Sequence, residues 1–324
     1  MKNLKQFVDV LCCPVCYSEL EFNRHNYICS NSSCQIYYPI VDEIPILLNE
    51  KKSIFTIDSF VQKKQTTFIS NSKGKVKLKK LINKIIPSIN GNYVSYEKLK
   101  SFKKIINDEI SNPKILIIGS GFESQGIKNN FSKSQNMLIL DTDVSFSSNI
   151  DVICDAHCLP FSNESFDAVI LQAVLEHVID PYNCVNEVKR VLKRDGFVYA
   201  ETPFMQQLHQ APFDFTRFTF LGHRWLFRGF IHIDSGVVCG PGMALAWSIR
   251  GLIKNMVKNR ILSRIFTIIT HLCFFWLKYI DYIIVKRKSA ALDSASSLFF
   301  IGRLNQIDMT FNELINYYNE ENLN

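Results

Sequence analysis

Short apolar runs, each followed by a glycine or a polar residue, recur through the middle of the chain. They cover residues 115–118, 138–140, 166–171 and 197–200. Runs of this length, with apolar side chains at most successive positions, are typical of parallel strands that are buried on both faces. Ligands of open α/β sheets bind beyond the carboxyl ends of such strands. The pattern therefore predicts a parallel sheet with a ligand site along one edge.

A helical spacing separates two of these runs. Residues 186–193 carry apolar side chains at helical intervals, and Gly196 is the expected C-cap. A strand, a helix and a further strand in this order form a right-handed crossover between parallel strands. A last apolar run, residues 297–302, is expected to complete the sheet as its antiparallel edge.

Residues 243–288, which precede this last run, are very apolar. A helix that spans a bilayer needs about 20 largely apolar residues, whereas Arg264 and Lys278 bound a shorter run that contains His271. We therefore expect a helical insertion that either covers the active site or lies in a membrane interface. Flanking cations favour the interface. They are Lys254, Lys258, Arg260, Lys286, Arg287 and Lys288.

The first apolar run leads into Gly119-Ser120-Gly121. Glycines after a strand allow the backbone to approach a ligand closely, and the N-terminus of a following helix offers free N–H groups. A dinucleotide-binding loop would read Gly-x-Gly-x-x-Gly, but position 124 is serine and the next glycine is Gly126. The spacing disfavours a nicotinamide-linked oxidoreductase. An ordinary strand-to-helix turn is the alternative interpretation.

An acid ends the second run. The carboxylate of Asp141 can accept hydrogen bonds from both hydroxyls of a ribose, as acids do at the end of the second strand of nucleotide-binding sheets. Asp143 competes for this role, and the alternative for Asp141 is a helix N-cap or a turn. A further expected strand, between residues 141 and 166, ends at Asp155, so soon after Asp141 that any helix between the two strands must be vestigial.

The order and spacing of these segments resemble the class I S-adenosylmethionine-dependent methyltransferases, in their type 11-like branch. The most specific strings are Asp155-Ala-His-Cys-Leu-Pro-Phe161 and Leu175-Glu-His-Val178. The resemblance covers residues 113–303 of the catalytic part. It implies an α/β fold, a Rossmann-like seven-stranded methyltransferase sheet with helices on both faces.

The resemblance also implies a set of residues that contact S-adenosylmethionine. In such a site Asp155 receives the adenine amino group, and the backbone N–H of Ala156 contacts the ring. The expected cofactor-binding residues are Gly119, Ser120, Gly121, Asp141, Asp155, Ala156 and Gln172.

Methyl transfer needs little covalent help, because the sulfonium is already activated and the protein must mainly align the acceptor and remove a proton from a hydroxyl. His177 is a candidate general base, or alternatively a packing residue that hydrogen-bonds a loop. In residues 203–219, which follow the fifth strand, His209, Asp214 and Arg217 alternate with phenylalanines. We expect these polar residues to line the acceptor side. Alternatively, the phenylalanines anchor the loop and Asp214 simply pairs with Arg217.

Two cysteine pairs near the N-terminus have the spacing of a zinc ribbon. Four thiolates around a short hairpin suit a structural Zn2+, and the segment up to Leu48 resembles the Trm112-like zinc ribbons, with Glu43 where glycine is usual. No apolar signal segment precedes the cysteines, so we do not expect disulfides. Cys12 is expected to be a bystander. The predicted ligands are Cys13, Cys16, Cys29 and Cys34.

We expect four parts: a zinc ribbon (1–48), a helical lysine-rich connector (49–110), the methyltransferase domain (111–303) and a C-terminal tail (304–324). The chain has 324 residues and a net charge of +7, and lysines crowd the connector. Most such lysines form a solvated helix face, but contact with anionic lipid or RNA is the alternative. The lysines are Lys73, Lys75, Lys77, Lys79, Lys80, Lys98, Lys100, Lys103 and Lys104.

The expected function is O-methylation of a sugar or another polar group in a bacterial cell-envelope glycan, its lipid-linked precursor or a related small molecule. Residues 203–219 and 240–247 resemble a methyltransferase branch found among envelope-biosynthesis proteins. We expect a cytoplasmic protein with peripheral contact to the inner face of the membrane. One alternative is an rRNA or tRNA methyltransferase with a ribbon recognition module, which the position of the lysines disfavours. A non-catalytic zinc-ribbon interaction protein is the other.

Overall fold

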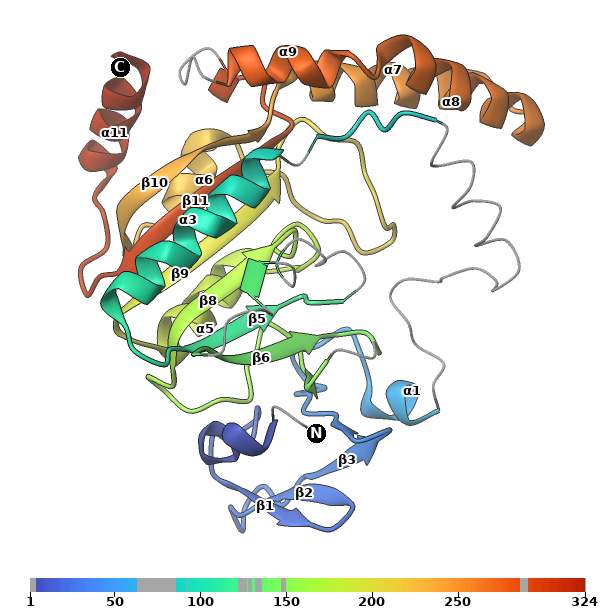
Figure 1. Ribbon diagram of the computed structural model, residues 1–324. Helices are drawn as coiled ribbons and strands as arrows, with labels where there is room; N and C mark the ends of the chain where they lie inside the picture. Colours follow the sequence, from blue (N-terminus) through green and yellow to red (C-terminus); the bar gives the residue numbers. More distant parts are fainter. Residues whose placement is uncertain are drawn as a thin grey trace.

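A seven-stranded sheet forms the centre of the molecule, in the order β10-β11-β9-β8-β5-β6-β7 (Figure 1). Strands β5 to β9 run parallel, and β10 and β11 are antiparallel to their neighbours. The sequence expectation of a Rossmann-like seven-stranded sheet is confirmed. The structure, a computed structural model, describes residues 4–62, 86–91, 93–121, 127, 130–131, 136–146, 150–285 and 291–323.

The parallel strands carry the apolar runs of the sequence. The chain runs outward from β5 through β6 to β7, and then returns to β8 and β9 on the other side of β5. Ligands of such sheets bind at this reversal, beyond the carboxyl ends of the strands. The strands are β5 (Lys114–Ile118), β6 (Leu138–Asp143), β7 (Val152–Ile153), β8 (Phe166–Gln172) and β9 (Leu192–Pro203).

The antiparallel strands correct one sequence expectation. Strand β11 (Ser297–Leu304) is not the edge of the sheet, because it lies between β9 and β10 (Phe230–Cys239) and pairs with both. The edge is β10, which the sequence analysis did not predict. His232 and Asp234 interrupt its apolar residues, and the ladder shifts register between them. An irregular edge strand has no clean alternation of apolar and polar residues.

Helix α3 (Tyr93–Glu109) covers one face of the sheet (Figure 1). It buries Leu99, Phe102 and Ile106, which lie on one side of the helix because their spacing is three or four residues. They join a buried cluster with residues of β5, β8 and β9, including Ile115. This helix falls within the segment expected to be a connector, and it serves as part of the sheet's covering layer.

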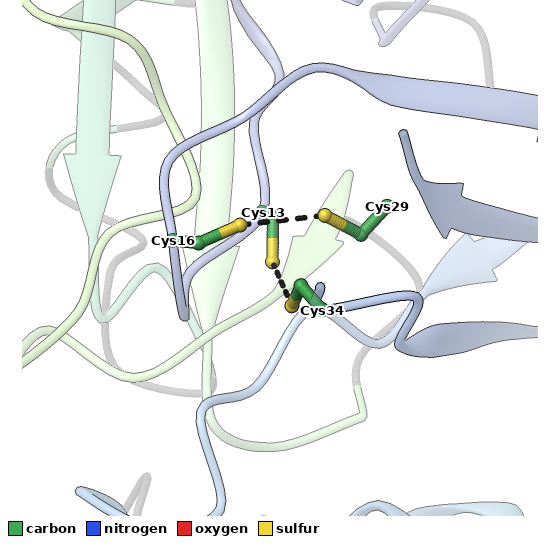
Figure 2. A group of neighbouring side chains, drawn as sticks. All are labelled: Cys13, Cys16, Cys29 and Cys34. Carbon is green, nitrogen blue, oxygen red and sulfur yellow. Dashed lines mark hydrogen bonds between the residues drawn. The ribbon is translucent and has the colours of Figure 1, made fainter. Parts of the chain in front are cut away.

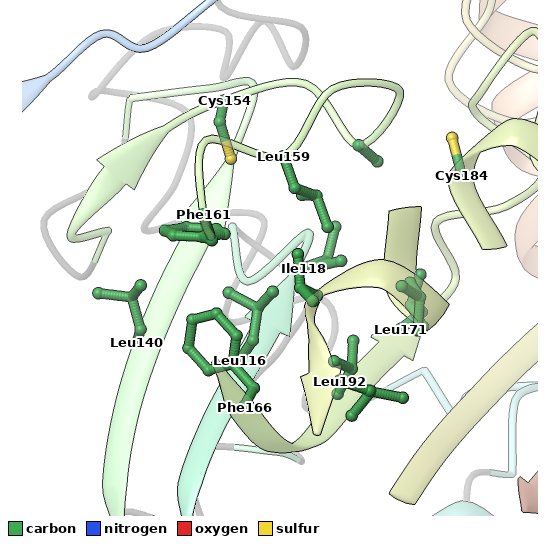
Figure 3. Close-up of a cluster of buried hydrophobic side chains, with 14 of the residues drawn as sticks. Leu116, Ile118, Leu140, Cys154, Leu159, Phe161, Phe166, Leu171, Cys184 and Leu192 are labelled. Carbon is green, nitrogen blue, oxygen red and sulfur yellow. The ribbon is translucent and has the colours of Figure 1, made fainter. Parts of the chain in front are cut away.

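The opposite face packs against α5 (Pro181–Val191) and α6 (Phe220–Leu226). Figure 3 shows the strand residues Leu116, Ile118 and Leu171 of this cluster, together with Cys184 of α5. Helix α5 starts where Asp180 accepts a hydrogen bond from the backbone N–H of Asn183, at 3.0 Å. It ends at Val191 and passes directly into β9. Gly196 therefore lies within β9, and its expected role as a helix C-cap is wrong.

The N-terminal ribbon lies beyond the β6–β7 end of the sheet (Figure 1). Ile46 pairs in parallel with Ile153 of β7, and the Leu47 N–H donates to the Ile153 carbonyl at 2.9 Å. Phe7 and Tyr38 belong to the same buried cluster as the sheet residues of Figure 3. The ribbon comprises η1 (Leu4–Gln6), η2 (Val8–Val10), β1 (Leu20–Asn23), β2 (Asn26–Cys29), β3 (Tyr37–Val41) and β4 (Ile44–Pro45), followed by α1 (Ile57–Val61).

The insertion between β10 and β11 is helical, as expected, and lies at the end of the molecule opposite the ribbon (Figure 1). It comprises α7 (Pro241–Met256), α8 (Arg260–Phe274) and α9 (Leu277–Ile284), and we call it the helical arm. Among the described helices, none is long and apolar enough to cross a bilayer alone. Taken together, helices α8 and α9 have the length and composition of a membrane span, but they meet at a bend of 42°. Helix α11 (Phe311–Leu323) ends the chain beside α6.

Candidate functional site

The turn after β5 brings backbone N–H groups to the carboxyl edge of the sheet. Gly119 has a φ of 75°, and a Cβ at this position would collide with Val174. The N–H groups of Gly119 and Ser120 donate to the Thr142 carbonyl, at 2.8 and 3.0 Å. A Cβ on Gly121 would lie 2.6 Å from a carboxylate oxygen of Asp143. Both glycines are therefore required by the close approach of this turn to its neighbours.

The two acids at the end of β6 have different surroundings. Asp141 pairs with Ile117 of β5, two residues before β6 ends, and its side chain is half-buried. Asp143 ends the strand, is 6% exposed and accepts the Gly121 N–H at 2.8 Å. Burial raises the pKa of Asp143 to about 6, although hydrogen bonds from the backbone of Gly121, Val144 and Ser145 oppose this shift. Asp143 is thus the acid that faces the glycine turn.

Asp155 lies in the loop after β7 and is 5% exposed. The Ser53 hydroxyl donates to its Oδ2 at 2.6 Å, and Oδ1 accepts from the backbone N and Nδ1 of His157, at 3.0 and 2.6 Å. Burial alone would raise the pKa of Asp155, but the hydrogen bonds and the charge of His157 lower it below its usual value. Ala156, next in the chain, is also buried. An ionised acid is therefore held at the position where the adenine was expected.

Gln172, at the end of β8, belongs to a buried polar network. Its amide donates to Ser95 of α3 at 2.8 Å and to Glu201 of β9 at 3.0 Å. Glu201 also accepts from Ser95 at 2.6 Å and from the Tyr199 hydroxyl. Burial raises the pKa of Glu201, against these hydrogen bonds. Gln172 thus ties three elements together beneath the edge of the sheet.

The loop after β9 brings His209 against the loop after β8, which carries Glu176 and His177. The rings of the two histidines meet edge to face with centroids 4.9 Å apart. Their Nε2 atoms lie 3.7 Å (His177) and 3.8 Å (His209) from the same oxygen of Glu176. The backbone carbonyl of Glu176 accepts the N–H of Phe215 at 2.8 Å, so the two loops are joined directly. The structure therefore places both predicted histidines in one cluster.

Asp214 and Arg217 pair with each other, as the alternative interpretation anticipated. Asp214 also accepts the backbone N–H of His209 at 2.7 Å, and its Oδ2 lies 3.4 Å from the His209 Nδ1. The Arg217 guanidinium donates to the backbone carbonyl of Gln206 at 3.2 Å. These two residues hold His209 and the loop in place, and the pair sits directly behind the histidine cluster.

Both histidines are biased toward the neutral form. Burial is the main cause that lowers the pKa of His177, although its hydrogen bond to the Phe213 carbonyl opposes the shift. Burial also lowers the pKa of His209, against the attraction of Asp214. The pKa of Asp214 is lowered by Arg217 and by the His209 N–H, which outweigh the effect of its burial. A neutral imidazole can accept a proton or bind a metal ion.

The four predicted cysteines come together in the ribbon (Figure 2). The sulfur atoms of Cys13 and Cys34 are 3.8 Å apart, and those of Cys16 and Cys29 are 3.4 Å apart. Sulfur atoms around a tetrahedral zinc ion at the usual bond length lie about 3.8 Å apart. The four thiolates therefore fit a structural Zn2+. The backbone N–H of Cys12 donates to the Pro160 carbonyl at 2.9 Å, and Cys12 is not a member of the four-cysteine group.

A model of the methyltransferase domain family, Methyltransf_11, matches residues 127–200. The matched segment begins after the glycine turn, extends into β9 and includes Asp143, Asp155 and His177. The chain has a class I S-adenosylmethionine-dependent methyltransferase domain. Its sheet order, with an antiparallel strand inserted beside the edge strand, is typical of this domain.

The N-terminal part of this methyltransferase belongs to the UPF0434 family, which is Trm112-like. A UPF0434 protein of Pseudoalteromonas translucida is 31% identical over 58 residues, 18% of this chain and 88% of the relative. One from Shewanella piezotolerans is 40% identical over 47 residues, 14% of this chain and 82% of the relative. Among solved structures, a phosphoethanolamine N-methyltransferase 2 of Haemonchus contortus with S-adenosyl-L-methionine is similar over 65% of this chain and 53% of its own. Its TM-score is 0.43 at 16% identity.

The residues of the methyltransferase site fit an adenosyl cofactor. A Cβ on Gly119 or Gly121 would collide with a neighbouring side chain, so the glycines let the turn lie close to the edge of the sheet. Two buried acids, Asp143 and Asp155, are the kind of acceptor that ribose hydroxyls and an adenine amino group require. Sequence reasoning missed Ser53, because a residue just after the ribbon gives no sign of contact with the loop after β7. It also gave no role to Glu176, although its place beside His177 was the available signal.

Proposed function

We propose that this methyltransferase transfers a methyl group to a hydroxyl oxygen of a sugar, or of another polar group, in a cell-envelope glycan or its lipid-linked precursor. The supporting observation is the cluster of Glu176, His177 and His209 at the carboxyl edge of the sheet. A hydroxyl acceptor must lose a proton during methyl transfer, and a carboxylate beside two neutral imidazoles can remove it. An uncharged amine would not require such a group.

For the cofactor, we infer that S-adenosylmethionine lies along the turn from Gly119 to Gly121. The bound cofactor supplies a methyl group on a positively charged sulfur. Its ribose hydroxyls would bind Asp143, or Asp141 as the sequence pattern suggested, and its adenine would lie at Asp155 and Ala156. Gln172 would support this arrangement from below through its bonds to Ser95 and Glu201.

On the acceptor side, we infer different tasks for the four polar residues identified in the sequence. His177 and His209 would handle the hydroxyl proton. Asp214 and Arg217 would act as positioning residues, because their side chains bond to each other and to the loop backbone. The charge of Asp214 would also orient the His209 ring.

We also propose that the helical arm contacts an anionic membrane surface at the inner face of the membrane. Helix α8 exposes apolar side chains over most of its length, including Ile261, Ile265 and Leu272. Lys254 and Lys258 lie beside it, and an apolar helix flanked by cations is typical of an interfacial helix. Such a position would bring the enzyme close to a lipid-linked acceptor.

RNA is the second candidate acceptor, because a ribbon and clustered lysines accompany the methyltransferase domain. Two connector lysines, however, bond within the protein: Lys98 to Asp234 at 2.6 Å and Lys103 to the Asn130 carbonyl at 2.5 Å. Lys73, Lys75, Lys77, Lys79 and Lys80 lie outside the described residues. Lys98 and Lys103 are therefore engaged within the protein, and this observation weighs against RNA.

The proposal is tested with labelled S-adenosylmethionine and fractionated extract of the source cells. We expect label in the glycan or lipid fraction with the native chain, and little with His209→Gln. His25→Gln, an exposed histidine on the ribbon hairpin, is the control and should match the native chain. Label in RNA or protein, with none in the glycan and lipid fractions, would show that the proposed acceptor is wrong.

A further inference from the structure

We propose that Glu176, His177 and His209 form a binding site for one divalent transition-metal cation, separate from the four cysteines. The inference rests on the proposed function, because the cation would bind the hydroxyl oxygen of the acceptor. One oxygen or nitrogen atom from each of the three side chains lies within 4.8 Å of the other two. The three residues come from two loops at the carboxyl edge of the sheet, beside the expected cofactor.

The spacing between the three side chains fits an ion better than direct hydrogen bonds. The Nε2 atoms of the two histidines lie 3.7 and 3.8 Å from one oxygen of Glu176. Hydrogen bonds between nitrogen and oxygen are about 2.7–3.2 Å long, so neither distance is a hydrogen bond. Ligand atoms around a tetrahedral zinc ion lie about 3.3 Å apart. The two nitrogen–oxygen distances exceed this value by about half an ångström.

An acceptor lies near the rear nitrogen of each histidine, the usual arrangement behind metal-binding imidazoles, although only the His177 Nδ1 makes a hydrogen bond to it. The Nδ1 of His177 bonds to the backbone carbonyl of Phe213. The Nδ1 of His209 lies 3.4 Å from Asp214, which Arg217 holds from the other side. A proton on each Nδ1 leaves both Nε2 lone pairs directed toward Glu176. Two loops thus present three preoriented donor atoms to one point.

The donor set selects the kind of ion. Two imidazoles and one carboxylate favour Zn2+, Mn2+, Fe2+ or Co2+ over Mg2+ and Ca2+, which prefer oxygen donors only. Three protein ligands leave at least one position open, as in catalytic metal sites. The cysteine cluster differs, because its four thiolates complete a tetrahedron.

The open position would take the acceptor's hydroxyl oxygen. A bound cation lowers the pKa of a coordinated hydroxyl, so its proton passes to water without a separate strong base. The oxygen then forms a bond to the methyl carbon while the carbon–sulfur bond breaks. The electron pair stays on sulfur, giving S-adenosylhomocysteine, and the metal keeps its oxidation state. With the cation bound, the two histidines would be ligands rather than bases, and the cation would replace them as the group that promotes loss of the hydroxyl proton.

The test uses the full-length chain with its cysteine cluster already saturated with zinc. Titration with Co2+ is followed by calorimetry and by visible absorption, in which oxygen and nitrogen ligands give weak bands without thiolate charge transfer. We expect one Co2+ per chain. His209→Ala and His177→Gln should each weaken Co2+ binding at least tenfold, in line with the loss of a ligand. His25→Ala should bind like the native chain.

Absence of Co2+ binding, or equal affinity in His209→Ala and the native chain, would overturn the metal site. Binding of S-adenosylhomocysteine by each variant reports that its fold is intact, and a variant that fails this check is replaced by the other. Label transfer to the glycan fraction without any Co2+ binding would overturn the metal site alone. Co2+ binding with label only in RNA would keep the metal site and overturn the proposed acceptor.

Discussion

Single carboxylates decide the chemistry of this site, because their neighbours differ sharply over short distances. Asp141 and Asp143 are two residues apart in one strand; Asp143 accepts the Gly121 N–H, whereas Asp141 pairs with Ile117 in the ladder. Asp214 and Asp155 are both held ionised by nearby hydrogen-bond donors, whereas burial dominates at Asp143. Which acid binds the ribose therefore depends on geometry at the strand end.

Asparagine substitutions distinguish the two acids. We expect Asp143→Asn to weaken binding of S-adenosylhomocysteine about tenfold or more, because charge-assisted hydrogen bonds contribute about 1.5–3 kcal/mol. Asp141→Asn should change the affinity about twofold or less, since its side chain lies before the strand end. Calorimetry measures both. A larger effect at Asp141 would restore the assignment that the sequence pattern favoured.

His223 makes stability depend on pH. It is 2% exposed, and burial, with Arg224 adding repulsion, lowers its pKa to about 3. The folded protein keeps His223 neutral, whereas the unfolded chain takes up a proton once the pH falls below about 6.5. The free energy of unfolding should therefore fall with pH between about 6.5 and 3, by roughly 2 kcal/mol at pH 5 from this residue.

Urea unfolding at neutral pH and near pH 5 measures this effect. His223→Leu should lose less stability on acidification than the native chain, because its buried side chain cannot be protonated in either state. His25→Leu, at an exposed position, should keep the native pH dependence. An unchanged pH dependence in His223→Leu would mean that another group controls acid stability.

Many residues of the site could be predicted from the sequence, because they directly follow the apolar runs that form the strands. The glycines, Asp155, His177 and His209 all lie at the expected edge of the sheet. The contact between Ser53 and Asp155 could not be predicted, because it depends on where the ribbon packs. The grouping of Glu176 with His209 depends on loop conformation, which no periodicity encodes.

The pattern of apolar residues predicted a helix or strand correctly where that element packs regularly against its neighbours. The parallel strands and α3 bury regularly spaced residues and agree with simple periodicity. Strand β10 escaped prediction because it lies at the edge, with polar residues and register shifts. Helix α5 ends at Val191 rather than near Gly196, because Leu192 is already buried as the first residue of β9. Where tertiary packing determines the end of a helix or strand, the local spacing of apolar residues does not predict it.

The helical arm leads to a prediction about membrane binding. We expect the protein to float with liposomes of anionic lipid at low salt and to dissociate at high salt, because each cation near such a surface contributes about 1 kcal/mol. Ile265→Glu, on the exposed side of α8, should lower the bound fraction strongly. Ile307→Glu, the same exchange at an exposed isoleucine before α11, is the control. Equal flotation of both variants would assign α8 another role.

Across the whole molecule, the ribbon and the sheet share one buried cluster. Phe7, Tyr38 and Leu47 of the ribbon segment pack with Leu116 and Leu171 of the sheet. A backbone hydrogen bond from Leu47 and the contact of Ser53 with Asp155 add polar links. We expect the two parts to unfold together, so that metal in the ribbon stabilises the methyltransferase fold as well.

Removal of the ribbon metal tests this coupling. Cys29→Ser should lower the zinc content of the purified chain and the melting temperature of the single transition, because a structural zinc site contributes directly to folding. Cys273→Ser, at an exposed cysteine of α8, should leave both unchanged. Differential scanning calorimetry with elemental analysis measures these values. Two separate transitions, with only one sensitive to metal, would contradict a shared core.

The pairing of Ile46 with Ile153 has a further consequence. Strand β7 is the last strand of the sheet on its side, and without the ribbon its outer backbone groups would be free to pair with another chain. The Leu47 N–H already occupies the Ile153 carbonyl at this margin. We therefore expect the ribbon to protect this edge of the sheet against pairing with another chain, whether or not a cofactor or acceptor is bound.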